Sequence, residues 1–406
     1  MTTTRGQVLR LKRDSLLPDK THTSVHQLRT EDGQQITGLL HTTDGANDVI
    51  CLAHPRQDLT HHPIIGELLA RGYAVWTQGT RSVNNDITLV HEQALLDIAA
   101  GQVFLRLAGF PRVITLGHSG GGSLFAFYHH QAALNPEDRI SKTPAGRPTQ
   151  LAVATMPVPD AAIFLAPHRG QGALLMKTID PSVADEADPL SVIPELDPYR
   201  PENGFAVPPQ PSKFRAEFVE RYRRAQQDRI AHIDTQAHMI LTDRNSAGAE
   251  QDPVASRRRA IAPRLLVVYR TDADLACVDP TIDPNDRPYG SLFGVRPDLT
   301  NYGLNGFARI TTADAWLSTW SGLSTNADFA RSAPYVHAPT LFIELTGDQA
   351  CTPVEASAMF AALGATDKTH IRLRGTHFGA SLTPGEPSGV SLSAQQIANW
   401  LAEKRF

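Results

Sequence analysis

The chain has 406 residues, of which 41% are hydrophobic and 20% are charged. This composition excludes a disordered or fibrous protein and is typical of a globular one. The length suits one large α/β domain with an insertion, or two domains. A formal net charge of −4 at pH 7 gives no reason to expect a nucleic acid or an anionic membrane as a partner.

We expect a cytoplasmic protein without a membrane partner. Residues 1–10 contain no apolar region of the kind found in signal peptides. No stretch approaches the ~18 consecutive apolar residues of a membrane span. The cysteines, Cys51, Cys277 and Cys351, are odd in number and far apart, which favours a reducing compartment over a disulfide framework. The sequence does not indicate an oligomeric state.

The first part of the chain predicts alternating strands and helices. Asp32-Gly33 separates two strand-like runs between residues 22 and 41 and is a hairpin signal. The remaining apolar patterns predict strands at 47–53, 73–76 and 113–117, and helices at 62–71, 88–107 and from about 120 onward.

A further apolar strand is predicted at 161–166, after which the alternation stops. The segment 168–337 is rich in proline and aromatic residues and predicts one amphipathic helix, 213–230, and a possible strand at 265–269. Strands at 340–345 and 371–373 and helices at 353–363 and 393–404 follow. Apolar, non-alternating strands that alternate with helices indicate a mostly parallel, doubly wound sheet covered on both faces. We therefore predict an α/β core formed by residues 1–167 and 338–406, interrupted by an insertion at 168–337.

The residues Gly117-His118-Ser119-Gly120-Gly121 stand between a predicted strand and a predicted helix. A Gly-x-Ser-x-Gly pentad in this position is the pattern of a nucleophile elbow, a sharp turn that exposes a strained serine. Side chains at 117 and 121 are expected to clash across such a turn. The pentad alone also fits an ordinary glycine-rich turn between a strand and a helix. Other residues of the sequence must therefore distinguish a catalytic serine from a structural one.

A nucleophilic serine needs a base, and the base needs an anion that orients it. Asp348 follows the strand 340–345, and His377 follows the last strand. Because the carboxyl ends of parallel strands meet at one edge of a sheet, we expect Ser119, Asp348 and His377 to converge there. The alternative interpretations are that Asp348 caps a helix and that His377 is a loop residue without a catalytic role.

Two hydrogen-bond donors are expected to stabilise the negative oxygen of a tetrahedral intermediate. One is the backbone amide of Gly120, and the other should come from the loop after the strand 47–53. Pro55 in that loop has no N–H, so we predict Arg56 as the second donor, with Gln57 as the alternative.

These motifs resemble the α/β-hydrolase superfamily. The similarity covers about 22–168 and 338–404, and rests on the elbow at 117–121, His54-Pro55, Asp348 and His377. It implies Ser119 as nucleophile, His377 as base and Asp348 as the residue that orients the base, without a cofactor. It also implies that 168–337 is a cap, inserted between the sixth and seventh core strands. The proline at position 55, where many members have glycine, is a departure from the family.

Four residues are candidates for the substrate pocket: His118, Tyr302, Trp316 and Trp320. Packing is the alternative for His118, and packing inside the insertion is the alternative for both tryptophans. We expect no metal, because His61-His62 and His129-His130 lack the spacing of paired ligands on one helix face. An acidic loop at 279–286 lacks the glycine that a calcium-binding loop needs.

The function predicted from these residues is hydrolysis of a carboxylic ester or lactone of a bulky, mainly apolar small molecule through an acyl-enzyme. The alternatives are an amide, thioester or C–C bond hydrolase that uses the same residues. A different class of alternative is a binding protein that has lost catalysis.

Overall fold

The computed structural model describes residues 17–246 and 252–406. Residues 1–10, on which the prediction of no signal peptide rests, lie outside the described residues. The main sheet has eight strands in the order β1-β2-β4-β3-β5-β6-β9-β10. The strands are β1 (His22–Arg29), β2 (Gln35–Thr42), β3 (Asp48–Ala53), β4 (Ala74–Gln78), β5 (Arg112–His118), β6 (Ala161–Leu165), β9 (Thr340–Gly347) and β10 (Lys368–Thr376).

The sheet is parallel from β4 to β10, and only β2 runs in the opposite direction, since it pairs in antiparallel fashion with both β1 and β4. The central strands are buried along their whole length because helices cover both faces. Helices α1 (Ile64–Leu69) and α11 (Gly389–Glu403) cover one face, and their apolar side chains form a core cluster with alternate strand residues.

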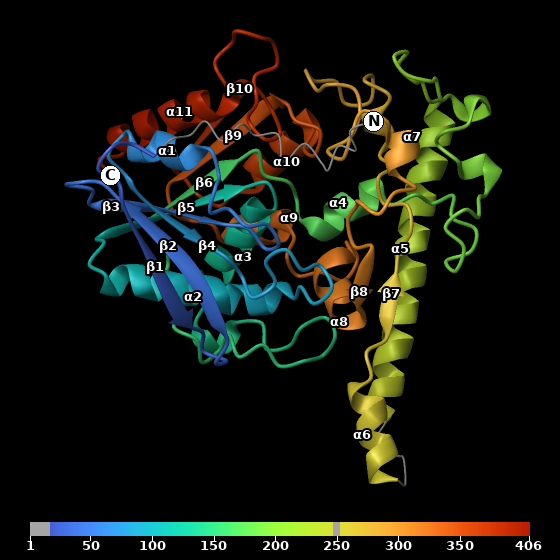
Figure 1. The fold of residues 1–406 in the computed structure, drawn as a ribbon, viewed down its shortest axis with the longest axis horizontal. Helices are drawn as coiled ribbons and strands as arrows, with labels where there is room; N and C mark the ends of the chain where they lie inside the picture. The colour runs from blue at the N-terminus through green and yellow to red at the C-terminus, as the bar shows by residue number, and fades with distance from the viewer. Residues whose placement is uncertain (1–16, 247–251) are drawn as a thin grey trace.

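Three further helices lie on the opposite face of the sheet: α2 (His91–Leu107), α3 (Gly120–Ala133) and α10 (Pro353–Ala362). Their buried residues form the second core cluster (Figure 1). The predicted fold class, a mostly parallel doubly wound sheet, is therefore confirmed.

The insertion lies between β6 and β9, the sixth and seventh strands of the main sheet. It contains a second, two-stranded antiparallel sheet, β7 (Leu265–Val267) and β8 (Ile310–Thr312). Its helices are α4 (Gln171–Thr178), α5 (Ala216–Asn245), α6 (Pro253–Ile261), α7 (Pro297–Thr300), α8 (Ala313–Ala315) and α9 (Phe329–Ser332). Figure 1 shows α5 as a long helix at the side of the molecule, with α6 at its far end.

The last helix of the insertion packs on the core. Phe329 of α9 lies in the same buried cluster as α3, and the segment also contributes Ala333 and Val336. The phenyl ring of Phe329 makes an edge contact with Phe164 of β6, with ring centroids 4.8 Å apart. The predicted cap, 168–337, thus ends in residues that belong to the packing of the α/β core.

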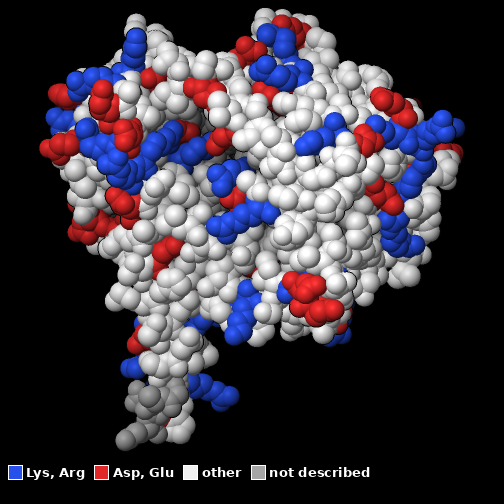
Figure 2. Space-filling model, turned by 180° about the vertical axis from the view of Figure 1, so that it is seen from behind, with Lys and Arg blue, Asp and Glu red and all other residues white. Residues whose placement is uncertain are grey.

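Charged side chains are mixed over the surface seen in Figure 2, with Lys and Arg among Asp and Glu and with uncharged atoms over much of the centre. Within residues 17–246 and 252–406, helices of sufficient length and apolar character to cross a membrane do not occur.

Candidate active site

Ser119 stands at the junction of β5 and α3 in a strained backbone conformation, with φ 57° and ψ −124°. Positive φ is costly for a residue with a side chain. The turn is tight because a Cβ on Gly117 would lie 2.5 Å from the carbonyl oxygen of Gly121. A Cβ on Gly121 would lie 2.4 Å from the carbonyl oxygen of Ala53 in β3. The expected clash at 117 is therefore across the turn, whereas the clash at 121 is with the neighbouring strand.

Three side chains from distant segments form one hydrogen-bonded chain. Ser119 Oγ lies 2.8 Å from His377 Nε2, and His377 Nδ1 lies 2.8 and 2.9 Å from the two carboxylate oxygens of Asp348. A carboxylate only accepts hydrogen bonds, so the imidazole proton is on Nδ1 and the free pair of Nε2 faces the serine hydroxyl. All three residues are buried. The structure thus brings together the residues that the sequence singled out.

Backbone amides hold the Asp348 carboxylate in place. Its Oδ1 accepts hydrogen bonds from the amides of Ala350 at 2.6 Å and Cys351 at 3.1 Å. Its own carbonyl accepts a hydrogen bond from the Asn285 side chain of the insertion. The insertion therefore contacts the acidic residue of the site directly.

A second histidine chain holds the backbone of His377. His62 Nδ1 accepts from the amide of Ile64, so His62 Nε2 carries its proton and donates to His118 Nδ1 at 3.1 Å. His118 Nε2 then donates to the carbonyl oxygen of His377 at 2.9 Å. Burial, followed by the nearby His377, lowers the pKa of His118 to about 4. His118 therefore follows the packing alternative, because it is a buried support of His377 and not a residue of the cavity described below.

The amide of Gly120 has no acceptor among the described residues, as the role predicted for it requires. The Arg56 amide differs from the prediction, because it donates to His54 Nδ1 at 3.1 Å. The Gln57 amide donates to the same nitrogen at 2.9 Å. Both candidates for the second donor are therefore engaged by one ring.

A cavity of about 510 Å³ opens beside the site, a volume within the range of small-molecule pockets. Phe378 links the two, since its ring lies 4.9 Å from the His377 ring, centroid to centroid, and also lines the cavity. The apolar lining residues are Ile87, Leu292, Phe293, Leu304, Phe307, Ile310 and Phe378, and the charged ones are Arg56, Asp86 and Arg309. Most of this lining comes from the insertion.

The three aromatic pocket candidates do not line this cavity. Trp316 and Trp320 are fully buried in the core of the insertion, and the indole N–H of Trp316 donates to Asp234 at 2.6 Å. Both tryptophans therefore pack inside the insertion, which was the alternative to a place in the substrate pocket.

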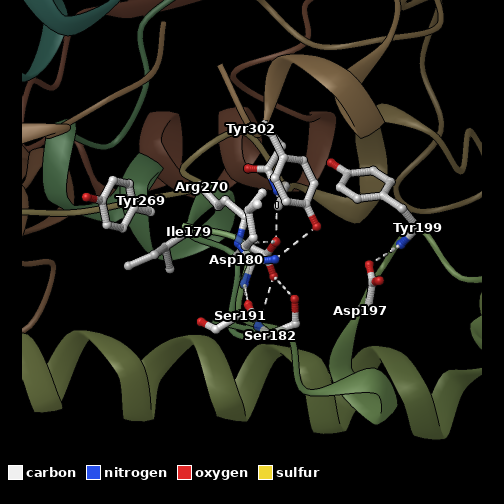
Figure 3. Close-up of polar contacts among 12 residues, drawn as sticks. Ile179, Asp180, Ser182, Ser191, Asp197, Tyr199, Tyr269, Arg270 and Tyr302 are labelled. Atoms are coloured by element: carbon white, nitrogen blue, oxygen red, sulfur yellow. Dashed lines mark hydrogen bonds and ion pairs between the residues drawn. The ribbon is translucent and has the colours of Figure 1, made fainter. Parts of the chain in front are cut away.

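Tyr302 lies elsewhere in the insertion, against the buried guanidinium of Arg270 (Figure 3). Arg270 Nη1 donates to the Tyr302 hydroxyl at 3.0 Å, and Arg270 Nε lies 3.6 Å from the carboxylate of Asp180. Tyr302 lines a second cavity, of about 380 Å³, together with Arg270. This cavity adjoins the first one, because Leu304, Arg309 and Ile310 line both. Tyr302 thus lines the neighbouring cavity and not the one that Phe378 lines, which differs from the prediction.

Several residues around Ser119 were not predicted to have a role in the site. The side chains of His54 and Gln171 lie against Gly120, and the amide of His168 donates to the carbonyl oxygen of Ser119 at 3.4 Å. His54 and His168 each follow a buried strand, as Asp348 and His377 do, and that shared position was the available signal. Within the described part of the chain, clusters of three or more His, Cys, Asp or Glu side chains that could hold a metal do not occur.

Comparison with known proteins gives a similar fold at low sequence identity. No family model and no curated protein sequence matches the chain. A solved structure of DcsB in complex with its substrate analogue is 13% identical, with 94% of this chain and 99% of that chain covered and a TM-score of 0.51. The α/β hydrolase GrgF from Penicillium sp. sh18 is 13% identical over 95% of this chain and 100% of that chain, with a TM-score of 0.49. The esterase domain of a Rhodothermus marinus protein is 11% identical over 94% of this chain and 98% of that chain, with a TM-score of 0.45.

Proposed function

We propose, on the premise that this chain has the α/β-hydrolase fold, that it is a serine hydrolase that cleaves a carboxylic ester or a lactone. The observation that carries the proposal is the hydrogen-bond chain from Ser119 Oγ through His377 to Asp348, with every link between 2.8 and 2.9 Å. A serine hydroxyl becomes a useful nucleophile only when such a base removes its proton.

In the first half of the reaction, Ser119 Oγ attacks the carbonyl carbon of the ester while its proton passes to His377 Nε2. The electrons of the C=O bond move onto the carbonyl oxygen, which the Gly120 N–H stabilises. The tetrahedral intermediate collapses, the bond to the leaving oxygen breaks, and His377 gives that oxygen its proton. Asp348 keeps the imidazole in the productive tautomer and stabilises the imidazolium that forms between these steps.

In the second half, water attacks the acyl carbon and His377 Nε2 takes a proton from it. Collapse of the second intermediate breaks the bond to Ser119, and the proton returns to Ser119 Oγ. The carboxylic acid is released and the free enzyme is restored.

The substrate is proposed to be a bulky and mainly apolar molecule. Seven of the cavity-lining side chains are apolar, and Phe378 carries that surface to the ring of His377. Apolar surface buried from water supplies most of the affinity in such pockets. Arg309 at the wall is suited to a polar end of the molecule, whereas the guanidinium of Arg56 is paired with Asp86.

A fluorophosphonate probe tests the proposed nucleophile without knowledge of the substrate. We expect covalent labelling at Ser119 in the wild type and none in Ser119→Ala. Turnover of a responsive ester should fall on the order of 10⁶-fold in kcat, as in serine hydrolases that lose the nucleophile. An unchanged melting temperature in Ser119→Ala is the control for folding.

Two outcomes would favour other functions. Labelling of Ser119 together with turnover of amides, thioesters or C–C bonds, but not of esters or lactones, would retain the mechanism and replace the substrate class. Absence of labelling in the folded wild type would favour a non-catalytic binding protein.

A further inference from the structure

The space beside Gly120 is occupied by two side chains from other segments. A Cβ on Gly120 would lie 2.8 Å from His54 Nε2 and 2.4 Å from Gln171 Nε2. Both distances are shorter than carbon–nitrogen contact allows, so residue 120 must lack a side chain for these nitrogens to approach. Because Gly120 directly follows Ser119, the two nitrogens lie beside the position where a substrate carbonyl would bind.

The hydrogen bonds of His54 fix where its proton is. Nδ1 accepts from the amides of Arg56 and Gln57, at 3.1 and 2.9 Å, and therefore carries no proton. Burial, followed by the nearby Arg56 guanidinium, holds the pKa of His54 well below its ordinary value, so the ring is neutral. A neutral imidazole with an accepting Nδ1 carries its proton on Nε2.

This Nε2–H has no acceptor among the residues that the structure describes. The Nε2–H is therefore free to donate to an atom of a bound substrate. The Gly120 amide beside it also has no acceptor in the described residues. Gln171 Nε2, at 2.4 Å from the Cβ position of Gly120, likewise has no acceptor in the described residues. Of these donors, the Gly120 amide and His54 Nε2–H come from a turn and a loop that flank the serine, and together they provide a site for one negatively charged oxygen.

We propose that His54 is a catalytic residue, whose Nε2–H is the second oxyanion donor in place of a backbone amide of the 54–57 loop. This inference rests on the proposed serine hydrolase function. Pro55 has no N–H, and the amides of Arg56 and Gln57 both donate to His54 Nδ1. The ring then presents a new donor on its opposite edge, toward Gly120.

The role of His54 is electrostatic, and its proton does not leave the ring. When Ser119 Oγ attacks, the electron pair of the C=O bond moves onto oxygen, and this oxygen accepts hydrogen bonds from Gly120 N–H and His54 Nε2–H. When the intermediate collapses, the pair returns to form the carbonyl and the leaving group departs with the proton from His377. The donors are already in place before the reaction, so no reorganisation is needed at that moment.

Two substitutions distinguish the two roles of His54, in which Nε2–H is a hydrogen-bond donor to substrate and Nδ1 is an acceptor that holds the loop. His54→Asn retains an acceptor near Nδ1 and removes the Nε2–H donor. His54→Gln places an amide N–H near Nε2 and removes the acceptor. The readouts are the rate constant for labelling of Ser119 by a fluorophosphonate and the kcat and KM for a 4-nitrophenyl ester, together with the melting temperature.

In His54→Asn we expect the labelling rate and kcat to fall about 10²- to 10³-fold, the loss typical of one oxyanion donor. KM should stay within threefold, because the ground-state carbonyl gains little from the donor, and the melting temperature should stay near that of the wild type. An alkyl boronic acid, whose adduct places an oxygen at the donors, should bind more weakly by a similar factor. In His54→Gln the labelling rate should stay within tenfold, while the melting temperature falls.

Three outcomes would overturn the proposal. His54→Asn could label and turn over within threefold of the wild type. Both His54 variants could lose activity equally, in proportion to their loss of stability, which would leave His54 only a loop support. Gln171→Ala could lose activity while His54→Asn does not, which would assign the donor to Gln171. Failure of the proposed function is distinct from all three, because it would leave Ser119 of the wild type unlabelled.

Discussion

Asp348 illustrates how one side chain serves both structure and chemistry. Its carboxylate binds the amides of Ala350 and Cys351 and also the ring of His377. An asparagine at this position keeps one oxygen for the two amides, so the loop is expected to retain its shape. Its NH₂ group would donate to His377 Nδ1 and favour the tautomer with the proton on Nε2. In that tautomer Nε2 cannot accept the proton of Ser119, so His377 no longer acts as the base.

We therefore predict that Asp348→Asn lowers kcat by about 10³- to 10⁴-fold while the chain stays folded. Steady-state kinetics with an ester that the wild type hydrolyses, together with a thermal melt, would check this. A loss of less than tenfold would show that Asp348 does not orient the base.

His118 is predicted to act by positioning His377 through its carbonyl group. His118→Leu removes that donor, and the resulting displacement of the catalytic ring is expected to lower kcat about 10- to 100-fold, since small misplacements of reacting groups are costly. The matched variant His118→Gln keeps an N–H near Nε2 and should stay within a few-fold of the wild type. Equal losses of kcat in the two variants would contradict a role through this hydrogen bond.

At the scale of elements, the insertion forms most of the wall of the cavity beside Phe378. Phe293 is one of the lining residues and packs edge-on against Phe307, with ring centroids 5.0 Å apart. Phe293→Ala removes apolar contact area from the cavity. We predict that kcat/KM for a bulky aromatic ester falls about 10- to 100-fold, the effect of about 1.5–3 kcal/mol of lost burial. Acetate esters of the same leaving group should change much less, and equal losses for both substrates would place the substrate elsewhere.

Trp316 tests the opposite role for an aromatic residue of the same insertion. It is fully buried in the core of the insertion and donates its indole N–H to Asp234. Trp316→Ala is expected to lower the free energy of unfolding of the insertion by about 3–5 kcal/mol, because it leaves a cavity and a lost hydrogen bond. Urea denaturation would measure the loss. An unchanged stability combined with an altered substrate preference would indicate that Trp316 lines the substrate pocket.

At the scale of the whole molecule, several histidines are buried in neutral form. Burial lowers the pKa of His91 and His118 to about 4, and that of His129 to about 3. In the unfolded chain these rings take up protons below about pH 6.5, whereas in the folded state they remain neutral until much lower pH. Unfolding therefore binds protons in this range, and stability falls as the pH falls.

We predict that the free energy of unfolding decreases between pH 6.5 and pH 4, by about 1.4 kcal/mol per pH unit for each proton taken up. Asp97 and Asp272 act in the opposite sense, because burial raises the pKa of each to about 6, so they offset part of the loss. Urea unfolding at several pH values would measure the slope. His129→Gln should flatten it, and stability that does not change from pH 7 to 4.5 would contradict the account.

The local chemistry of the sequence was sufficient to predict the fold class and the residues that meet in the site. Strand residues without alternation indicated a sheet buried on both faces, and Ser119, Asp348 and His377 each follow a strand of that sheet. The long helix α5 was expected to end at Ile230, although its buried residues continue at helical spacing through Ile233, Ala237 and Leu241. The helical periodicity of the sequence thus extends beyond the predicted end of the helix.

What the sequence by itself determined was the identity of the residues at the carboxyl edge of the sheet, because strand order along the chain and local periodicity are properties of short segments. Only the tertiary structure decided what surrounds those residues. The direction of the Arg56 amide, the burial of Trp316 and the approach of His54 to Gly120 all depend on contacts between segments far apart in the chain. Such contacts are set by packing and by the satisfaction of buried polar groups, which no short stretch of sequence specifies.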